Sequence, residues 1–147
     1  MSKKKQETPL PKKDGRGASA RRKGHAAERS IASELRELGW SHAATTRATS
    51  RQLDNAKVDV NFVPFNIQSK AVKQDLKFSD YVKLLDEVKQ GLLSLPPELL
   101  YRLAYPSMIF HKKDRETLVV MRKHDFYHLL THYHLNKTNT NTDVQSK

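Results

Sequence analysis

The chain has 147 residues and a net charge of +11, with 27 Lys and Arg residues against 16 Asp and Glu. This length suits one domain with tails. The absence of cysteine excludes disulfides and thiolate chemistry. No apolar run approaches the roughly 20 residues of a membrane-spanning helix, and the first ten residues lack the apolar core of a signal peptide. These features favour a soluble protein of the cytoplasm, with no membrane partner.

The positive charge is concentrated at the N-terminus. Residues 1–23 hold nine Lys or Arg and two acidic residues, whereas the other 124 residues hold 18 basic and 14 acidic ones. Large apolar residues are almost absent there, so residues 1–22 are expected to form a disordered basic arm. Such an arm suits a polyanion, most simply nucleic acid, because binding releases counterions from the phosphates. A solubilising tail or a localisation signal is the alternative interpretation.

The predicted domain covers residues 23–135 and opens with an amphipathic helix. Residues 24–39 carry apolar side chains at three- and four-residue steps, with Gly39 as a stop signal and Glu28 at the edge of the stripe. Small and β-branched residues predict a strand at 42–49, and polar residues predict a loop at 50–56.

The stretch KVDVNFVPFNIQSK, residues 57–70, predicts a β-hairpin with a two-residue turn at Val63 and Pro64. Side chains alternate along a strand, so Val58, Val60 and Phe62 would face one way, and Asp59 and Asn61 the other. On the second strand, Asn66, Gln68 and Lys70 would share the polar face. In that register Asp59 lies opposite Gln68, with Lys70 two residues further on the same side.

The second half of the chain predicts two more helices and two more strands. A helix at 79–90 has Ser79 as N-cap and a buried stripe of Tyr81, Val82, Leu85 and Val88. A short helix starts near residue 97, and strands follow at 106–113 and 116–123. A last helix at 123–134 is expected to bury Phe126, Leu129, Leu130 and Tyr133, before a frayed polar tail at 136–147. The order α-β-β-β-α-β-β-α predicts an α/β or α+β domain with a mixed central sheet flanked by helices.

The polar face of the predicted hairpin has the side chains that phosphodiester hydrolysis requires. Mg²⁺ prefers oxygen ligands, which Asp59, the side chain of Gln68 and the backbone carbonyl of Ser69 can supply. Lys70 can orient or deprotonate a water molecule, or place a charge near the phosphate. Glu28 can reach the same patch from the first helix, and Asp54 is a further acidic residue nearby. An ordinary solvated strand face is the alternative interpretation.

Basic and hydroxyl side chains near this patch are candidates for phosphate contacts. The expected nucleic-acid-binding residues are Arg21, Arg22, Lys23, Arg47, Ser50, Arg51, Lys57 and Lys73. His124, His128 and His132 recur every four residues on the last helix, a spacing that can bind Zn²⁺. The histidines lie opposite the apolar stripe of that helix, which favours an exposed polar face. Trp40 is expected to cover the core.

The ordered set of Glu28, Asp59 and Gln68-Ser69-Lys70 resembles the PD-(D/E)xK nuclease superfamily, and within it the archaeal-type Holliday junction resolvases and related phage nucleases. KGHAAERSIASELRELGW is similar to their opening helix, and TTRATSR to the strand and loop that follow. KVDV stands at their Pro-Asp motif and IQSK at their Glu-x-Lys motif. The similarity covers about residues 22–134.

The resemblance implies a restriction-endonuclease-like core and a Mg²⁺-dependent endodeoxyribonuclease, with Mn²⁺ as a substitute metal. It implies that Glu28, Asp59, Gln68 and Lys70 are the catalytic and metal-binding residues. Four-way DNA junctions are the narrower substrate, and a resolvase is expected to be a two-fold homodimer that makes paired cuts.

Two positions depart from the family pattern. Val58 replaces the nominal Pro, and Gln68 replaces the usual acidic residue, which removes one negative charge beside the metal. The second departure leaves an alternative function open: a catalytically inactive relative that binds DNA, or that belongs to a phage or other nucleoprotein assembly and is associated with the virion.

Overall fold

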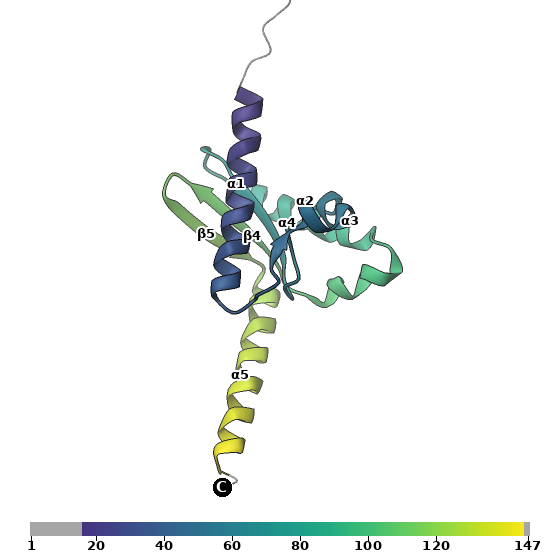
Figure 1. Cartoon of the computed structure of the whole chain (residues 1–147), viewed down its shortest axis with the longest axis vertical. Coiled ribbons are helices and arrows are strands. Elements are labelled where there is room, and N and C mark those ends of the chain that lie inside the picture. Colours follow the sequence, from purple (N-terminus) through teal and green to yellow (C-terminus); the bar gives the residue numbers. More distant parts are fainter. Residues whose placement is uncertain (1–15, 146–147) are drawn as a thin grey trace, which may run out of the picture.

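The computed structural model describes the backbone of residues 16–145 and the side chains of residues 17–136. Most of the predicted basic arm, residues 1–15, therefore lies outside the described residues. In the part of the chain that is described, no helix combines the length and the apolar character needed to cross a membrane. The chain forms a mixed α+β domain from which one long helix extends at each end (Figure 1).

The helices and strands follow one another in an order close to the predicted one, with two extra short helices. In chain order they are α1 (Arg16–Glu37), β1 (Ala44–Thr45), α2 (Thr46–Thr49), α3 (Arg51–Asn55), β2 (Val60–Asn61), β3 (Asn66–Ala71), α4 (Phe78–Leu93), the 3₁₀ helix η1 (Pro97–Ala104), β4 (Ser107–Lys113), β5 (Glu116–Met121) and α5 (Lys123–Gln145).

The central sheet is mixed, as predicted, and has the order β3-β4-β5. β3 pairs with β4 in parallel, and β4 pairs with β5 in antiparallel orientation. A separate two-stranded antiparallel sheet joins β1 to β2. β3 is therefore an edge strand of the central sheet, and the segment before β2 reaches its free edge.

Helices α1 and α4 cover opposite faces of the central sheet. Ile31 of α1 packs in one apolar cluster with Met108 of β4, whereas Val88 of α4 packs in another cluster with Ile109. Because Met108 and Ile109 are adjacent in one strand, their side chains point to opposite faces. The sheet is thus the middle of three layers, and its two faces hold the two halves of the core.

The apolar spacing of α1 and α4 explains their packing, although both begin earlier than predicted. α1 begins at Arg16 rather than at residue 24, so residues 16–22 of the predicted arm are helical. Arg and Ala in this stretch are good helix formers. α4 begins at Phe78, and Asp80 rather than Ser79 caps it by accepting the Lys77 N–H at 2.7 Å.

The strand predicted at 42–49 is present but much shorter, and the loop predicted at 50–56 is wrong. Only Ala44–Thr45 is a strand, and two short helices follow it. The hydroxyl of buried Thr46 donates to the Val58 carbonyl at 2.7 Å, and Ser50 caps α3 by accepting the Leu53 N–H at 3.3 Å. These side-chain bonds give the backbone an alternative to strand pairing.

The predicted β2–β3 hairpin is also wrong, because β2 pairs with β1 instead. Phe62 adopts a left-handed φ of 63°, which interrupts the side-chain alternation after β2. Its ring is therefore exposed, while Asn61 is buried, the reverse of the prediction. On β3, Asn66 and Gln68 are buried rather than on a solvated face.

The last helix is longer and less buried than predicted. α5 runs to Gln145, through the tail that was expected to fray. Phe126, Leu130 and Tyr133 are exposed, and only Leu129 of the predicted stripe packs against the core. The physical reason is visible in Figure 1, where α5 leaves the sheet and extends away from the domain.

Candidate active site

Asp59 is held at the free edge of β3 by two hydrogen bonds. Its N–H donates to the Ile67 carbonyl at 2.8 Å, and its Oδ2 accepts the Ser69 N–H at 2.7 Å. These bonds place the carboxyl beside the Gln68–Lys70 segment. The N–H and C=O of one strand residue point to the same edge, so the Ser69 carbonyl also faces the side on which Asp59 lies.

Burial and several neighbouring groups shift the pKa of the Asp59 carboxyl. Burial raises the pKa of Asp59 from 3.8 to about 7, and the carboxylates of Glu28 and Asp54 add to the increase. The hydrogen bond from Ser69 and the ammonium group of Lys70 lower this pKa, but by less. Glu28, Asp54 and Lys70 therefore lie close enough to Asp59 to interact with it electrostatically. A carboxyl that titrates near neutral pH is typical of functional sites.

Glu28 reaches the cluster from the buried face of α1. It lies on the same helical face as Ala27 and Ile31, and the same packing that buries these residues buries the carboxylate. Arg47 of α2 lies near it, with Nη2 at 3.5 Å from Glu28 Oε1. The side chain of Arg47 remains half exposed, which leaves its guanidinium able to contact a phosphate.

Gln68 is buried, and its Oε1 has no hydrogen-bond donor among the described residues. A buried acceptor without a partner costs free energy, and native structures contain few of them. A cation would remove this cost, since amide, carbonyl and carboxylate oxygens are the ligands that Mg²⁺ accepts. The donor set of Asp59, Gln68 and the Ser69 carbonyl therefore fits a hard divalent metal, with Glu28 nearby.

Among the described residues, no group of three His, Cys, Asp or Glu side chains has metal-binding geometry. The candidate site differs from such a group because a neutral amide stands where a third acidic residue would be. On α5, His128 and His132 contact each other, with their Nε2 atoms 3.2 Å apart, but among the described residues no third His, Cys, Asp or Glu joins them to complete a zinc site.

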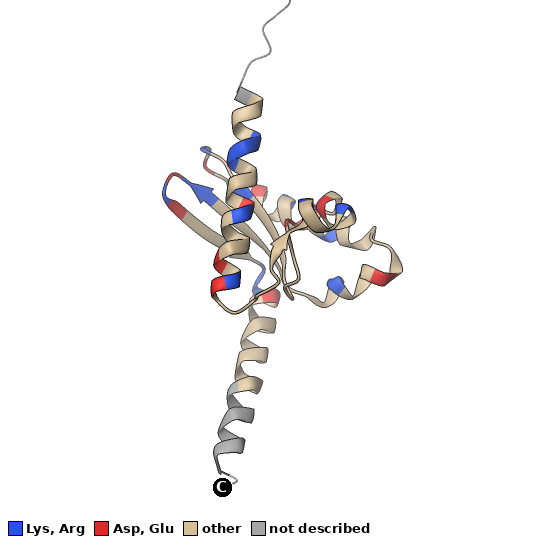
Figure 2. Cartoon of the chain, in the orientation of Figure 1, with Lys and Arg blue, Asp and Glu red and all other residues tan. Residues whose placement is uncertain are grey.

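The predicted phosphate-binding residues divide into two groups. Lys23 and Lys73 line one cavity of about 550 Å³ between α1 and the end of β3, where Lys112 joins them. Arg21 and Arg22 are exposed on the preceding turn of α1, so basic residues follow this helix toward the cavity (Figure 2). The arrangement gathers basic residues along α1 and at this cavity, which Asp114 also lines.

The other predicted contacts lie elsewhere. Lys57 is exposed and lines a separate cavity against α4. Arg51 is exposed on α3, whereas the Ser50 hydroxyl oxygen is engaged as the cap of that helix. The structure therefore does not bring Lys57 together with Lys23 and Lys73.

Sequence reasoning missed His111, which lies beside Lys70 on the neighbouring strand. The parallel register of β3 and β4 pairs these two residues, and the Tyr81 hydroxyl lies 2.7 Å from His111 Nδ1. His111 Nε2 is buried without a partner in the described residues. Nothing in the local sequence indicates this neighbour, because it follows from pairing between strands that are 41 residues apart along the chain.

Comparison of the chain with protein-family models, with curated proteins and with solved structures finds no significant match. The functional argument therefore depends on the geometry of the Asp59 cluster and on the sequence motifs that form it.

Proposed function

We propose that this chain is a metal-dependent endodeoxyribonuclease with a restriction-endonuclease-like core, which hydrolyses phosphodiester bonds with Mg²⁺ or, in its place, Mn²⁺. One observation carries the proposal: a carboxyl group whose pKa is about 7 lies beside the segment that contains a buried amide oxygen without a donor. Each feature is costly in the free protein, and one cation between them would relieve both. The order of Glu28, Asp59, Gln68 and Lys70 supports the same conclusion.

The residues of this chain have distinct roles in that reaction. Asp59, Gln68 Oε1 and the Ser69 carbonyl would hold the metal, with Glu28 in support. Bound there, Mg²⁺ would supply polarisation of the phosphate and a more acidic water molecule. Lys70 places a positive charge beside Asp59 and would stabilise the negative charge that develops on the phosphate.

Substrate binding would use the basic surface. The cavity that contains Lys23, Lys73 and Lys112 would hold the DNA backbone, and Arg47 would contact the phosphate nearest the cluster. We extend the proposal to branched DNA, including four-way junctions, cut by a two-fold homodimer in the cytoplasm. The exposed apolar residues of α5, among them Tyr133 at 67 % exposure, provide surface for such a dimer.

A second candidate function is favoured by Gln68 itself. The amide carries no charge, so the site binds Mg²⁺ more weakly than one with an acidic residue there. A catalytically inactive protein that binds DNA, or that joins a phage nucleoprotein assembly and is carried in the virion, would keep the basic surface and lose only cleavage.

One assay distinguishes the two candidate functions. A labelled four-way junction and its linear duplex are incubated with the full chain in Mg²⁺, in Mn²⁺ or in EDTA, beside Asp59→Asn and the control Asp86→Asn. Asp86 is an exposed residue paired with Arg122, and it is not among the groups that shift the pKa of Asp59. Cleavage that requires metal, is lost in Asp59→Asn and is retained in Asp86→Asn is the expected result. Tight binding of the junction without cleavage in either metal would refute the nuclease and support the second candidate.

A further inference from the structure

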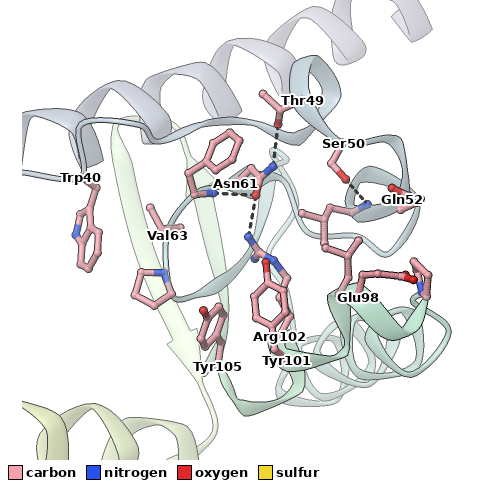
Figure 3. Close-up of a pocket in the computed structure, with 15 residues that line it drawn as sticks. Trp40, Thr49, Ser50, Gln52, Asn61, Val63, Glu98, Tyr101, Arg102 and Tyr105 are labelled. Carbon is pink, nitrogen blue, oxygen red and sulfur yellow. Dashed lines mark hydrogen bonds between the residues drawn. The ribbon is translucent and has the colours of Figure 1, made fainter.

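A third cavity, of about 710 Å³, is bordered by α2, α3, η1 and the turn between β2 and β3 (Figure 3). Asp59, Gln68 and Lys70 do not line it. Four aromatic residues do: Trp40, Phe62, Tyr101 and Tyr105. Tyr101 and Tyr105 meet edge to face at 5.7 Å between ring centroids. The volume is within the range of pockets that hold small organic ligands.

The cavity contains a buried positive charge without an acidic partner. Arg102 lines it and is only 2 % exposed. Its guanidinium bonds only to neutral oxygens: Nη2 donates to Asn61 Oδ1 at 2.9 Å, and Nη1 donates at 3.4 Å to Asn66 Oδ1 and to the Phe65 carbonyl. The Nε–H has no acceptor, and no carboxylate forms an ion pair with Arg102 in the described part of the chain. An anion in the cavity would offset this charge.

The charge lies near the middle of the cavity, beside the ring of Tyr105 (Figure 3). Glu98 is the single acidic residue among those that line it, and Figure 3 shows Glu98 at the end opposite Trp40. The Arg102 guanidinium carbon lies 5.8 Å from the centroid of the Tyr105 ring. A ligand with both a flat aromatic part and a negative charge therefore matches the rings and the buried charge of this cavity.

The backbone at Phe62 is strained in a way that places its ring at this cavity. A φ of 63° is unfavourable for a bulky side chain, and such strain concentrates at functional sites. Asn61 holds the conformation, because its Oδ1 accepts the Phe62 N–H at 2.8 Å as well as the Arg102 bond. The amide of Asn61 also donates to Thr49 Oγ1 at 3.2 Å.

The cavity and the candidate active site use neighbouring residues of two chain segments, 47–49 and 59–61. Asn61 follows Asp59 by two residues, and Thr49 follows Arg47, the neighbour of Glu28, by two residues. Both sites are therefore built on the same two segments of the chain.

We infer that the cavity binds one unstacked nucleotide of the DNA substrate, with its base against the exposed rings and its phosphate charge balancing Arg102. The inference rests on the proposed function for its class of ligand. Base–aromatic stacking accepts any base, but it requires the base to leave the duplex stack. The protein would then prefer DNA with unpaired bases, such as the open centre of a branched substrate, over continuous duplex.

Trp40 is the only tryptophan in the chain, so its fluorescence reports on this cavity alone. The full-length protein in EDTA is titrated with a four-nucleotide thymidine oligomer and with an abasic oligomer of the same length and charge. Stacking predicts that the thymidine oligomer quenches Trp40 and binds about 5- to 100-fold more tightly than the abasic one. In Tyr101→Ser this preference should fall at least about fivefold.

The matched control is Tyr127→Ser on α5, because Tyr127 is 56 % exposed and Tyr101 is 53 % exposed. Both substitutions remove rings of similar exposure, so a loss of folding would not explain a difference in binding between the two variants. The control should keep the full preference for the thymidine oligomer. Equal binding of the two oligomers, unchanged Trp40 emission, or the same loss in both variants would overturn the inference.

The junction cleavage assay separates this result from the nuclease proposal. Metal-dependent cleavage without a preference for the thymidine oligomer would overturn only the nucleotide cavity. A Tyr101-dependent preference without cleavage would support the cavity and overturn only the nuclease.

Discussion

Asp59→Asn should stabilise the metal-free protein at neutral and alkaline pH. The folded-state pKa of Asp59 is about 7, above the unfolded value of 3.8, so the folded state binds a proton more tightly. The stability that this proton provides is complete below pH 3.8 and is lost as the pH rises through about 7. Asparagine is neutral at every pH and can still accept the Ser69 N–H, so the variant does not suffer this loss.

The size of the effect follows from the two pKa values. An increase from 3.8 to about 7 corresponds to about 4 kcal/mol in the free energy of unfolding. The difference in that free energy between Asp59→Asn and the wild type should therefore increase by this amount from about pH 4 to about pH 8. Most of the change should occur between pH 3.8 and about pH 7, because in this range the Asp59 carboxyl is ionised in the unfolded wild type but still protonated in the folded wild type.

Urea denaturation followed by circular dichroism in EDTA measures this difference, with Asp86→Asn as the control. Asp86 is exposed and paired with Arg122, so its substitution should give no comparable pH dependence. Mg²⁺ at 100 times its dissociation constant should then add about 2.7 kcal/mol to the wild type at pH 8 and much less to Asp59→Asn. A difference between Asp59→Asn and the wild type that stays constant within about 0.5 kcal/mol over the whole pH range would refute the described environment of Asp59.

Three further predictions follow from the same structure. Gln68→Glu adds a carboxylate beside the proposed metal ligands, so the Mg²⁺ concentration at half-maximal cleavage should fall about tenfold, while junction binding in EDTA stays within about twofold; unchanged metal dependence would place Gln68 outside the proposed site. Glu28→Gln removes a charge that raises the pKa of Asp59, so the pH midpoint of the stability loss should move to lower pH in the same urea titrations; a midpoint that does not move would show that Glu28 is not a neighbour. Gly91→Ala would place a Cβ 2.5 Å from a backbone carbonyl oxygen and should cost about 1–3 kcal/mol in urea denaturation, whereas Gly24→Ala, which meets nothing within 4 Å, should be neutral or stabilising; equal effects would contradict the close approach at Gly91.

The sequence predicted the residue types of the candidate site better than it predicted their arrangement in space. The types and order of Glu28, Asp59, Gln68 and Lys70 were evident, and the structure places Asp59 within electrostatic range of Glu28 and Lys70. The sequence predicted that a regular hairpin would bring these groups together, and this prediction is wrong. Two hydrogen bonds from one residue to the edge of β3 bring the groups together instead. Such an irregular contact has no period that a sequence pattern could reveal.

The sequence by itself determined the elements whose signal is local. Apolar spacing placed most of α1 and α4, and β-branched and aromatic runs placed β4 and β5, because a helix or strand that buries one face must repeat its apolar residues with a fixed period. The charge of the N-terminal segment and the mixed α+β class follow from composition and element order in the same way.

Only the tertiary structure decided which segments meet. α5 carries a pattern that suggests burial, but the domain offers its outer part no surface, so Tyr133 remains exposed. Arg102 looks like an ordinary helical arginine, yet it bonds to Asn61 across 41 residues and becomes the buried charge of a cavity. Burial without a partner, at Gln68 Oε1 as at Arg102 Nε, depends on every neighbour in space, and a linear pattern carries no record of these neighbours.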